Sequence, residues 1–136
     1  MYKTHEVKGF TLIEIIVVMI IVGILATLGL TQYTKLVEKG RTAEAKSILG
    51  SIRTAEEAYK LEKGVYTATF ADLPVGAPTA CAATHFFSYG IDSADATTFT
   101  SRAARCTSGG KTPAAGTAYN VTINEAGNWG GTSGYY

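Results

Sequence analysis

Apolar side chains fill almost every position from Phe10 to Leu30, so this segment has no polar face. Glu14 is its single charged residue. A helix of roughly 20 apolar residues is long enough to span the hydrocarbon core of a bilayer. We therefore predict a membrane-spanning helix. The basic residues Lys3 and Lys8 before it indicate a cytoplasmic N-terminus and an exported remainder of the chain.

The helical pattern continues after the apolar run, but it now has two faces. Between residues 43 and 62, apolar side chains recur every three or four positions, at Ala45, Ile48, Ile52, Ala55 and Tyr59. The other face is charged and carries Glu44, Lys46, Arg53, Glu56, Glu57 and Lys60. This periodicity is typical of an amphipathic helix. Lysines in the last turn and Gly64 after it mark a helix end, so one helix is predicted over about 10–63.

The pattern changes after Gly64, because residues 65–78 contain proline and glycine turn signals. Strand candidates follow at 85–91, 97–106 and 118–124. We expect residues 92–96 to close a hairpin, residues 125–128 to form a turn and Trp129 to begin a further short strand, before a mobile or weakly docked tail. A small antiparallel sheet packed on the amphipathic half of the helix would give an α+β fold.

Two cysteines, Cys81 and Cys106, lie in the part predicted to be exported, where disulfides persist. A bridge between them would tie the start of the first strand to the end of the second. The alternatives are a metal pair or a reactive thiol. The sequence has no CxxC motif, and His85 is the only histidine after the N-terminal segment. We therefore predict the disulfide and expect neither a metal nor a cofactor.

Charge and motifs argue against catalysis. His85 has no evident nucleophile and acid around it, and no phosphate-binding or zinc-protease motif is present. The chain has 12 basic and 11 acidic side chains and a net charge of +1, so no basic field indicates nucleic acid along the whole chain. A local basic patch stays open. The C-terminal aromatic residues suit head packing better than a sticky filament surface.

Glu14 is the residue that a simple membrane anchor does not explain. A carboxylate at the centre of a spanning helix costs about 2.5–3.5 kcal/mol on insertion scales, and less near the interface. Such an acid usually needs a partner, and we expect none within the apolar run. A secretory signal peptide fits no better, because it would have a shorter apolar core and a small-residue cleavage site.

The stretch KGFTLIE at residues 8–14 resembles the class III signal of the type IV pilin family, and the likeness covers about residues 1–64. Gly9 matches the end of the leader, Phe10 the first mature residue and Glu14 the family's fifth, a glutamate. The resemblance implies cleavage after Gly9 and N-methylation of Phe10. It also implies that Glu14 pairs with the Phe10 amine of a neighbouring subunit and sets the register of a filament. The alternative is a glutamate that reaches water at the membrane edge.

The resemblance also implies an organisation and a set of partners. It divides the chain into a leader (1–9), a transmembrane and polymerisation helix (10–31), an amphipathic half (32–64) and a head (65–136). It implies a type IVa-like major pilin, held in the inner membrane and then assembled into an extracellular pilus for adhesion, motility or DNA uptake. The implied partners are other copies of the chain, a prepilin peptidase, an assembly ATPase, an inner-membrane platform protein and membrane lipid. The sequence leaves open whether the subunit is major or minor and whether it binds nucleic acid.

One departure from the family concerns helix flexibility. Gly23 aligns with a glycine common in pilins, but many pilins have a proline where this chain has Thr31. Several pilus helices loosen between these two points, so the missing proline puts that local melting in question. Gly29 could supply part of the same weakness. Alternatively, the small residues only let helices pack closely in the membrane.

Two other functions remain open at this stage. One is a pseudopilin of a type II secretion system, and a calcium site would favour it. The acids of the C-terminal half are too sparse to predict such a site, which favours a pilus weakly: Asp72, Asp92, Asp95 and Glu125. The other is a membrane-anchored binding domain that is neither processed nor polymerised.

Overall fold

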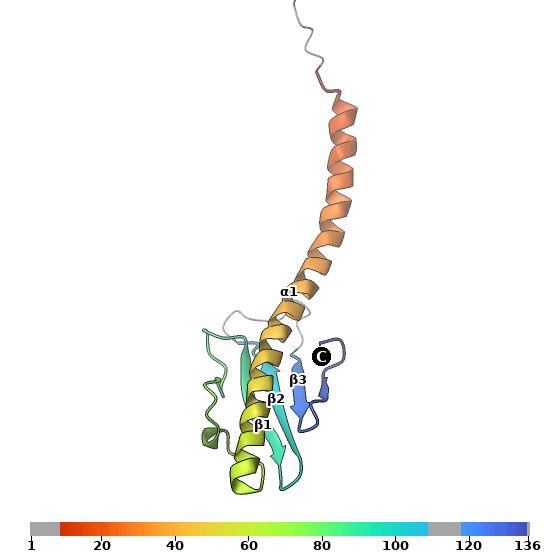
Figure 1. The fold of residues 1–136 in the computed structure, drawn as a ribbon. Helices are drawn as coiled ribbons and strands as arrows, with labels where there is room; N and C mark the ends of the chain where they lie inside the picture. Colours follow the sequence, from red (N-terminus) through yellow and green to blue (C-terminus); the bar gives the residue numbers. More distant parts are fainter. Residues whose placement is uncertain (1–8, 109–117, 136) are drawn as a thin grey trace, which may run out of the picture. The chain divides into compact units, whose positions relative to one another are not determined.

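The computed structural model describes residues 9–108 and 118–135 (Figure 1). The predicted leader up to Lys8 and the C-terminal Tyr136 lie outside these residues. The elements are α1 (Leu12–Lys63), a short 3-10 helix η1 (Phe70–Asp72), β1 (Phe87–Ala94), β2 (Phe99–Arg105), β3 (Asn120–Asn124) and β4 (Trp129–Gly131). One long helix followed by a small antiparallel sheet confirms the predicted α+β fold. The chain divides into two compact units between Lys35 and Leu36.

In the N-terminal unit, α1 begins at Leu12 and its backbone stays helical past Gly23, Gly29 and Thr31. The Thr27 hydroxyl donates a hydrogen bond to the Gly23 carbonyl at 2.9 Å. The helix is long and apolar enough to cross a membrane, with a mean hydropathy of 2.8 over its most apolar stretch. None of that stretch is buried within the structure, so its side chains are free to meet lipid or other helices.

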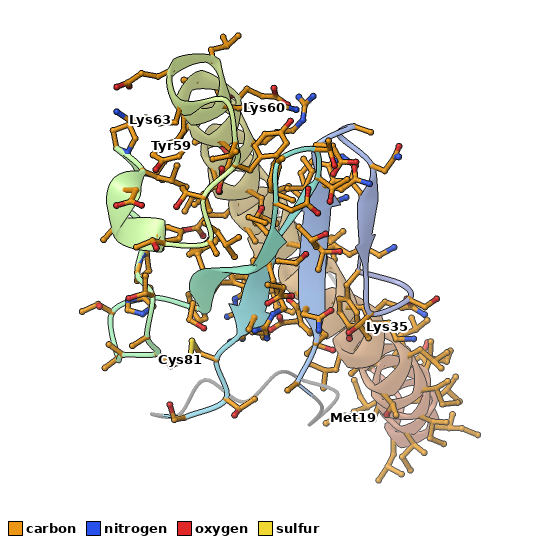
Figure 2. The ribbon with its side chains drawn as sticks, turned by 90° about the horizontal axis from the view of Figure 1, so that it is seen from below. Met19, Lys35, Tyr59, Lys60, Lys63 and Cys81 are labelled. Carbon is orange, nitrogen blue, oxygen red and sulfur yellow. A yellow bond between two sulfur atoms is a disulfide. The ribbon has the colours of Figure 1, made fainter. Side chains whose placement is uncertain are left out.

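The end of α1 follows the prediction. Gly64 has a φ of +82°, and its N–H donates to the carbonyl of Lys60 at 2.8 Å. A left-handed residue directly after a helix satisfies one of the last helical carbonyls, and glycine takes this conformation without a side-chain clash. Figure 2 shows Lys60 and Lys63 in this last turn.

In the C-terminal unit, the four strands form an antiparallel sheet in the order β1-β2-β3-β4. Along β2, buried and half-buried residues alternate strictly, as expected for a sheet with one covered face. The strand β1 is longer than predicted, because residues 92–94 continue it instead of forming the loop. A register shift between Ile91 and Ser93 absorbs Asp92, and Ser93 then pairs with Thr100.

The turn between β1 and β2 is therefore shorter than the predicted loop, and Asp95 closes it. Its carboxylate accepts hydrogen bonds from the N–H groups of Thr97 at 2.7 Å and Thr98 at 2.8 Å. These two bonds, with those from both threonine hydroxyls, hold the pKa of Asp95 well below its usual range. An aspartate that binds the backbone two residues on is a known turn former, so the DATT sequence carried this signal.

Neither outer strand of the sheet, β1 or β4, presents a long and fully open edge. On β1, the N–H of Tyr89 donates to the carbonyl of Pro78 at 2.8 Å, so the connecting segment covers part of that edge. At the other side, β4 contains three residues. Its Gly131 has a φ of +115°, and a Cβ there would collide with the backbone of Asn120.

The core lies between the second half of α1 and one face of the sheet (Figure 1). Seven described positions of the helix are buried: Glu38, Thr42, Ala45, Leu49, Ile52, Ala55 and Glu56. The predicted apolar face is confirmed but is wider than expected: Ala45, Ile52 and Ala55 are buried, and Ile48 and Tyr59 pack partly buried against the core. Leu49 is fully buried, whereas Ile48 and Tyr59 are half-buried. Glu56, which we expected on the polar face, is fully buried.

The C-terminal tail is docked, which corrects the expectation of a mobile or weakly docked segment within the described residues. Gly130 and Gly131 belong to β4. The ring of Tyr135 stacks on the ring of Tyr119, with 3.8 Å between their centroids and 7° between their planes. Because Tyr119 is itself buried in the core, this stacking fixes the tail to the sheet.

The predicted disulfide is confirmed. Cys81 and Cys106 are joined, with their Cα atoms 5.6 Å apart (Figure 2). Cys106 directly follows β2, and Cys81 lies in the loop that leads into β1. The bridge therefore ties this loop to the base of the β1–β2 hairpin. Neither cysteine is available as a metal ligand or a reactive thiol.

Candidate assembly site at the N-terminus of the long helix

Glu14 has a partner within its own chain, which corrects the expectation that the apolar run supplies none. Its Oε2 accepts hydrogen bonds from the N–H and the hydroxyl of Thr11, both at 2.8 Å. In return, the N–H of Glu14 donates to the Thr11 hydroxyl at 3.3 Å. Thr11 is the N-cap residue of α1 and Glu14 is its third helical residue, so the two form a reciprocal capping box.

The capping box could have been read from the sequence. A threonine followed three residues later by a glutamate, just before an apolar run, is the signature of a helix start. The position of Glu14 as the single charge of an apolar run masks this local signal. Glu14 thus has a local structural role, because it accepts hydrogen bonds from backbone and side-chain donors at the N-terminus of α1.

The capping box leaves part of the carboxylate available. Both bonds from Thr11 end on Oε2 of Glu14, whereas a carboxylate can accept about four hydrogen bonds through its two oxygens. The Glu14 side chain is exposed and borders an open hollow of about 430 Å³, which Phe10, Ile13, Val17 and other apolar residues line. An incoming cation can therefore reach Glu14 beside an apolar surface.

The other residues of the predicted processing site lie directly before the helix. Gly9 and Phe10 precede the N-cap and are exposed. A Cβ on Gly9 would meet no atom within 4 Å among the described residues. The backbone here is thus accessible, as a peptidase substrate requires. Cleavage after Gly9, methylation of Phe10 and the flexibility assigned to Gly23 and Gly29 stay predictions.

A second polar cluster joins α1 to the sheet inside the C-terminal unit. Glu38 accepts hydrogen bonds from Nε and Nη2 of Arg105, both at 3.1 Å, and from the hydroxyl of Tyr119 at 2.8 Å. Arg41 also pairs with Glu38 from the next turn of the helix. The side chains of Glu38 and Arg105 are almost fully buried. A buried carboxylate is tolerated here because charged and neutral donors surround it.

The charges in this cluster set the ionisation of its members. Burial alone would raise the pKa of Glu38. The hydrogen bonds from Arg105 and Tyr119 and the charges of Arg105 and Arg41 outweigh burial, so the pKa lies below the ordinary 4.5. Burial and the bond to Glu38 raise the pKa of Tyr119 to about 12. At neutral pH, Glu38 is therefore ionised and Tyr119 is neutral.

Sequence reasoning missed this cluster, although a signal existed. Glu38 and Thr42 extend the spacing of four and three residues that runs through Ala45, Leu49 and Ile52. A carboxylate in phase with a buried face predicts a buried ion partner on the opposing element. Arg105 on β2 was a candidate, but nothing in the sequence selects it over Arg102, which pairs instead with the exposed Asp92 at 2.8 Å.

The described residues contain no group of three or more histidine, cysteine, aspartate or glutamate side chains that could hold a metal ion. His85 contacts the loop around it, with its Nε2 2.6 Å from the carbonyl oxygen of Ala80. This contact matches the structural role expected for a lone histidine.

A single long helix, apolar in its first part and packed on a small antiparallel sheet in its second, has the architecture of the pilin class. Residues 5–30 match the family model described as a prokaryotic N-terminal methylation motif. Residues 31–117, more than half of the chain, match the family model described as "Type IV minor pilin ComP, DNA uptake sequence receptor". The chain therefore belongs to this family of type IV pilins.

Individual relatives agree with this assignment over part of their length. The chain is 41% identical over 61 residues to the fimbrial protein EcpC of Eikenella corrodens, a match covering 45% of this chain and 40% of the relative. It is 37% identical over 60 residues to the type IV major pilin protein PilA of Myxococcus xanthus, covering 44% and 27%. It is also 41% identical over 67 residues to the type II secretion system core protein G of Pseudomonas aeruginosa, covering 49% and 47%. The chain thus spans less than half the length of these relatives.

Proposed function

We propose that the chain is a structural subunit of a type IV pilus, made as a precursor and polymerised through α1. The observation that carries this proposal is the capped but exposed Glu14, placed four residues after Phe10 at the start of an uncovered apolar helix. The match of residues 5–30 to the methylation motif supports processing at the same place. The family is structural, and we assign the chain no catalytic activity.

Assembly follows from two steps at the helix start. Cleavage after Gly9 creates a positive amine at Phe10, which N-methylation leaves charged. In a filament core, a buried charge without a partner is strongly destabilising, whereas a paired charge is much less so. The amine of one copy pairs with Glu14 of its neighbour while Thr11 holds the carboxylate in place. Glu14 thereby favours one axial register between neighbouring helices.

Burial of the first half of α1 supplies the driving force. Its large side chains are about half exposed or more, and they include Ile13, Met19 and Leu25. Lipid covers this surface in the precursor, and other copies of α1 cover it in the filament. Ordered contact between helices then replaces contact with lipid. The segments of the chain take the roles of leader (1–9), polymerisation helix (10–31), amphipathic half (32–64) and head (65–136).

The route to the filament requires other proteins and a membrane. The precursor is a single-pass inner-membrane protein with a cytoplasmic N-terminus, consistent with Lys3 and Lys8 before the apolar run. A prepilin peptidase removes the leader at the cytoplasmic face. An assembly ATPase and an inner-membrane platform protein then add the subunit to an extracellular pilus.

One observation favours a specialised role within the pilus. The family that matches residues 31–117 is described as a minor pilin and receptor for a DNA uptake sequence. This description favours a minor subunit that contacts DNA over the major pilin expected from the sequence. Adhesion and motility are the other uses of such a filament.

The likeness to a type II secretion core protein supports the pseudopilin alternative, in which the same helix would build a short periplasmic assembly. The test is the N-terminus and intact mass of the protein from sheared cell-surface filaments. A chain that begins at methylated Phe10 supports the pilus. The same processed chain confined to the membrane fraction supports the pseudopilin. A chain that retains its leader supports the unprocessed binding domain.

A further inference from the structure

The uncharged part of α1 in the N-terminal unit is bounded by two charged residues, Glu14 and Lys35. The residues between them, 15–34, carry no charge and lie in one continuous helix. At about 1.5 Å per residue, these roughly 20 residues extend over about 30 Å, which equals the thickness of the hydrocarbon core of a bilayer. The charges therefore predict a membrane span roughly four residues further along the chain than the apolar run that begins at Phe10.

Tyr33 and Lys35 are residue types that hold the end of a helix at a membrane surface. Tyr33 is the first aromatic residue after the apolar run, and Lys35 is the first charged one. Tyrosine rings collect at the level of the lipid headgroups, and lysines near helix ends extend their ammonium groups to the same level. Tyr33 is 65% exposed and Lys35 is also exposed, so both can reach lipid. Because they are two positions apart, they leave the helix on nearly opposite sides and can hold it from both.

We propose that Tyr33 and Lys35 form a lipid anchor, in which the ammonium of Lys35 binds phospholipid phosphates and the ring of Tyr33 lies among the headgroups. The anchor fixes the depth of α1 in the bilayer and thereby places Glu14 at the cytoplasmic surface. This inference rests on the membrane-held precursor proposed above, and it adds the lipid contacts that set the position of the helix in the membrane.

The alternative depth centres the apolar run, residues 10–30, in the bilayer. Glu14 would then lie four residues inside the inner hydrocarbon boundary, at a depth of about 6 Å. An ionised carboxylate is unfavourable there. The anchored depth avoids this burial and instead brings Gln32 just below the outer headgroups, which costs less because an amide is uncharged.

An anchored helix keeps the groups that take part in processing and assembly in contact with water. The bond between Gly9 and Phe10 precedes Glu14 in the chain, so it lies outside the hydrocarbon, where a peptidase can reach it. The Phe10 amine of a neighbouring copy can also meet Glu14 at the membrane surface, without either charge crossing the hydrocarbon. Thr11 holds Oε2 of Glu14 in the meantime and leaves the other carboxylate oxygen available.

Met19 is a suitable probe of depth, because the chain has two methionines and the other, Met1, belongs to the predicted leader. Figure 2 shows Met19 and Lys35 on α1. The anchored helix places Met19 about 8 Å from the inner hydrocarbon boundary, whereas a centred apolar run places it about 14 Å from that boundary, near the bilayer midplane.

The test uses the full precursor, with carbon-13 in its methionine methyl groups, in nanodiscs of phosphatidylcholine. Nuclear relaxation is measured with a gadolinium chelate in the water and, separately, with a nitroxide at the end of the lipid tails. Met1 serves as the aqueous reference. Circular dichroism checks that each variant keeps its fold.

We expect the Met19 methyl group of the wild type at the shallower of the two depths. The variant Y33A/K35Q should let the helix slide, so that Met19 moves about 6 Å toward the midplane. The variant Y33W/K35R should keep the wild-type depth, because tryptophan and arginine also suit the membrane surface. The matched control is K63Q, which removes one positive charge from the last turn of the same helix and should leave the depth unchanged.

Several outcomes overturn the proposal. A wild-type Met19 near the midplane does so directly. A shallow Met19 that stays in place in Y33A/K35Q also does so, because Glu14 or the apolar run would then set the depth. An equal shift in K63Q would mean that net charge sets the depth and not the anchor. These three results leave the membrane-held precursor standing, whereas a Met19 as accessible to the chelate as Met1 would show that the chain does not span the bilayer.

Discussion

Arg105 of β2 clamps Glu38 of α1 with two parallel hydrogen bonds of 3.1 Å, across 67 residues of sequence. The two side chains are 0% and 4% exposed. The pair therefore works in a dry environment, at the end of the helix face that the sheet covers. It fixes where along α1 the sheet begins, because moving the sheet by one turn would leave two buried charges without partners.

Removal of one member of this pair should destabilise the C-terminal unit severely. We expect Glu38→Ala to lower the free energy of unfolding by about 3–5 kcal/mol, because it leaves the Arg105 guanidinium buried without its counter-charge. Urea unfolding of the processed chain in detergent, followed through the fluorescence of Trp129, measures the change. Trp129 is the only tryptophan of the chain, so the signal reports on the sheet alone.

The control for this variant is Arg102→Ala, which removes an exposed ion pair with Asp92 from the same strand. That change should cost about 0–1 kcal/mol. Equal losses in the two variants would contradict the role assigned to the buried pair.

The wild type should also lose the stability that Glu38 contributes as pH falls below 4.5. The pKa of Glu38 is lowered in the folded state, so the unfolded state takes up the proton first.

The pH dependence of stability that arises from Glu56 should be opposite in sign to that from Glu38. It is fully buried, Oε2 accepts the N–H of Thr67 at 3.1 Å, and Oε1 has no hydrogen-bond partner among the described residues. Burial, opposed by the Thr67 bond and reinforced by the charge of Glu57, raises the pKa of Glu56 above 4.5. Its folded form therefore retains a proton that the unfolded form has lost, and stability falls as pH rises from 4.5 through the raised pKa.

The variant Glu56→Gln removes this titration and should flatten the decline of stability above pH 4.5. Unfolding curves for wild type and variant at a series of pH values from acid to neutral provide the comparison. Glu62→Gln is the control, because it removes an exposed carboxylate from the same helix, one that pairs with Lys63. A Glu56→Gln profile with the same slope as the wild type would show that Glu56 ionises freely in the fold.

Two substitutions at the helix start separate the capping role of Glu14 from its charge. Glu14→Gln keeps a side-chain oxygen that can accept the Thr11 bonds, since glutamine serves in capping boxes, but it removes the charge. We expect this variant to enter the membrane and to yield few or no filaments. Thr11→Ala keeps the charge and loses the cap, at a cost of about 1 kcal/mol, so filaments should form in reduced amount.

Filament yield is measured from sheared surface material, with the membrane fraction as the measure of insertion. Normal filaments from Glu14→Gln would refute the ion-pair register and leave helix capping as the whole function of this residue. Loss of membrane insertion in either variant would instead place the defect before assembly.

The same substitution at one glycine within α1 and at the glycine directly after it should change stability in opposite directions. Gly50 is helical, and a Cβ there would meet no atom within 4 Å, so Gly50→Ala should stabilise by about 0.5–1 kcal/mol. Gly64 has a φ of +82°, so Gly64→Ala should destabilise by about 1 kcal/mol or more. Denaturation midpoints of the two variants and the wild type give their order of stability. A stabilising Gly64→Ala would mean that the helix ends in another conformation.

Local patterns in the sequence predicted the helix and strands better than they predicted which distant side chains contact one another. The glycine after Lys63 marked the helix end, the alternation of residues 118–124 marked β3, and the two exported cysteines predicted their disulfide. Each of these signals acts within a few residues or through a single pair. The buried helix face is wider than predicted because it also includes Leu49 and Glu56, and a carboxylate can be buried when a hydrogen bond and a raised pKa reduce the cost.

The long-range polar contacts were not predictable in the same way. Glu38 meets Arg105 and Tyr119 only after the sheet has folded onto the helix, and one sequence offers several arginines for that role. The stacking of Tyr135 on Tyr119 likewise depends on the path of the tail after β4. The capping box, in contrast, was predictable, because its signal lies in Thr11 and Glu14 alone and needs no tertiary contact.

The two edges of the sheet restrict how this chain can polymerise. An open strand edge can recruit an identical strand from another copy and seed aggregation. Here Pro78 occupies part of the β1 edge, and β4 contains three residues. Strand addition is therefore disfavoured on both sides. Copies of this chain in the proposed filament would therefore associate through their helices and not by strand addition between their heads.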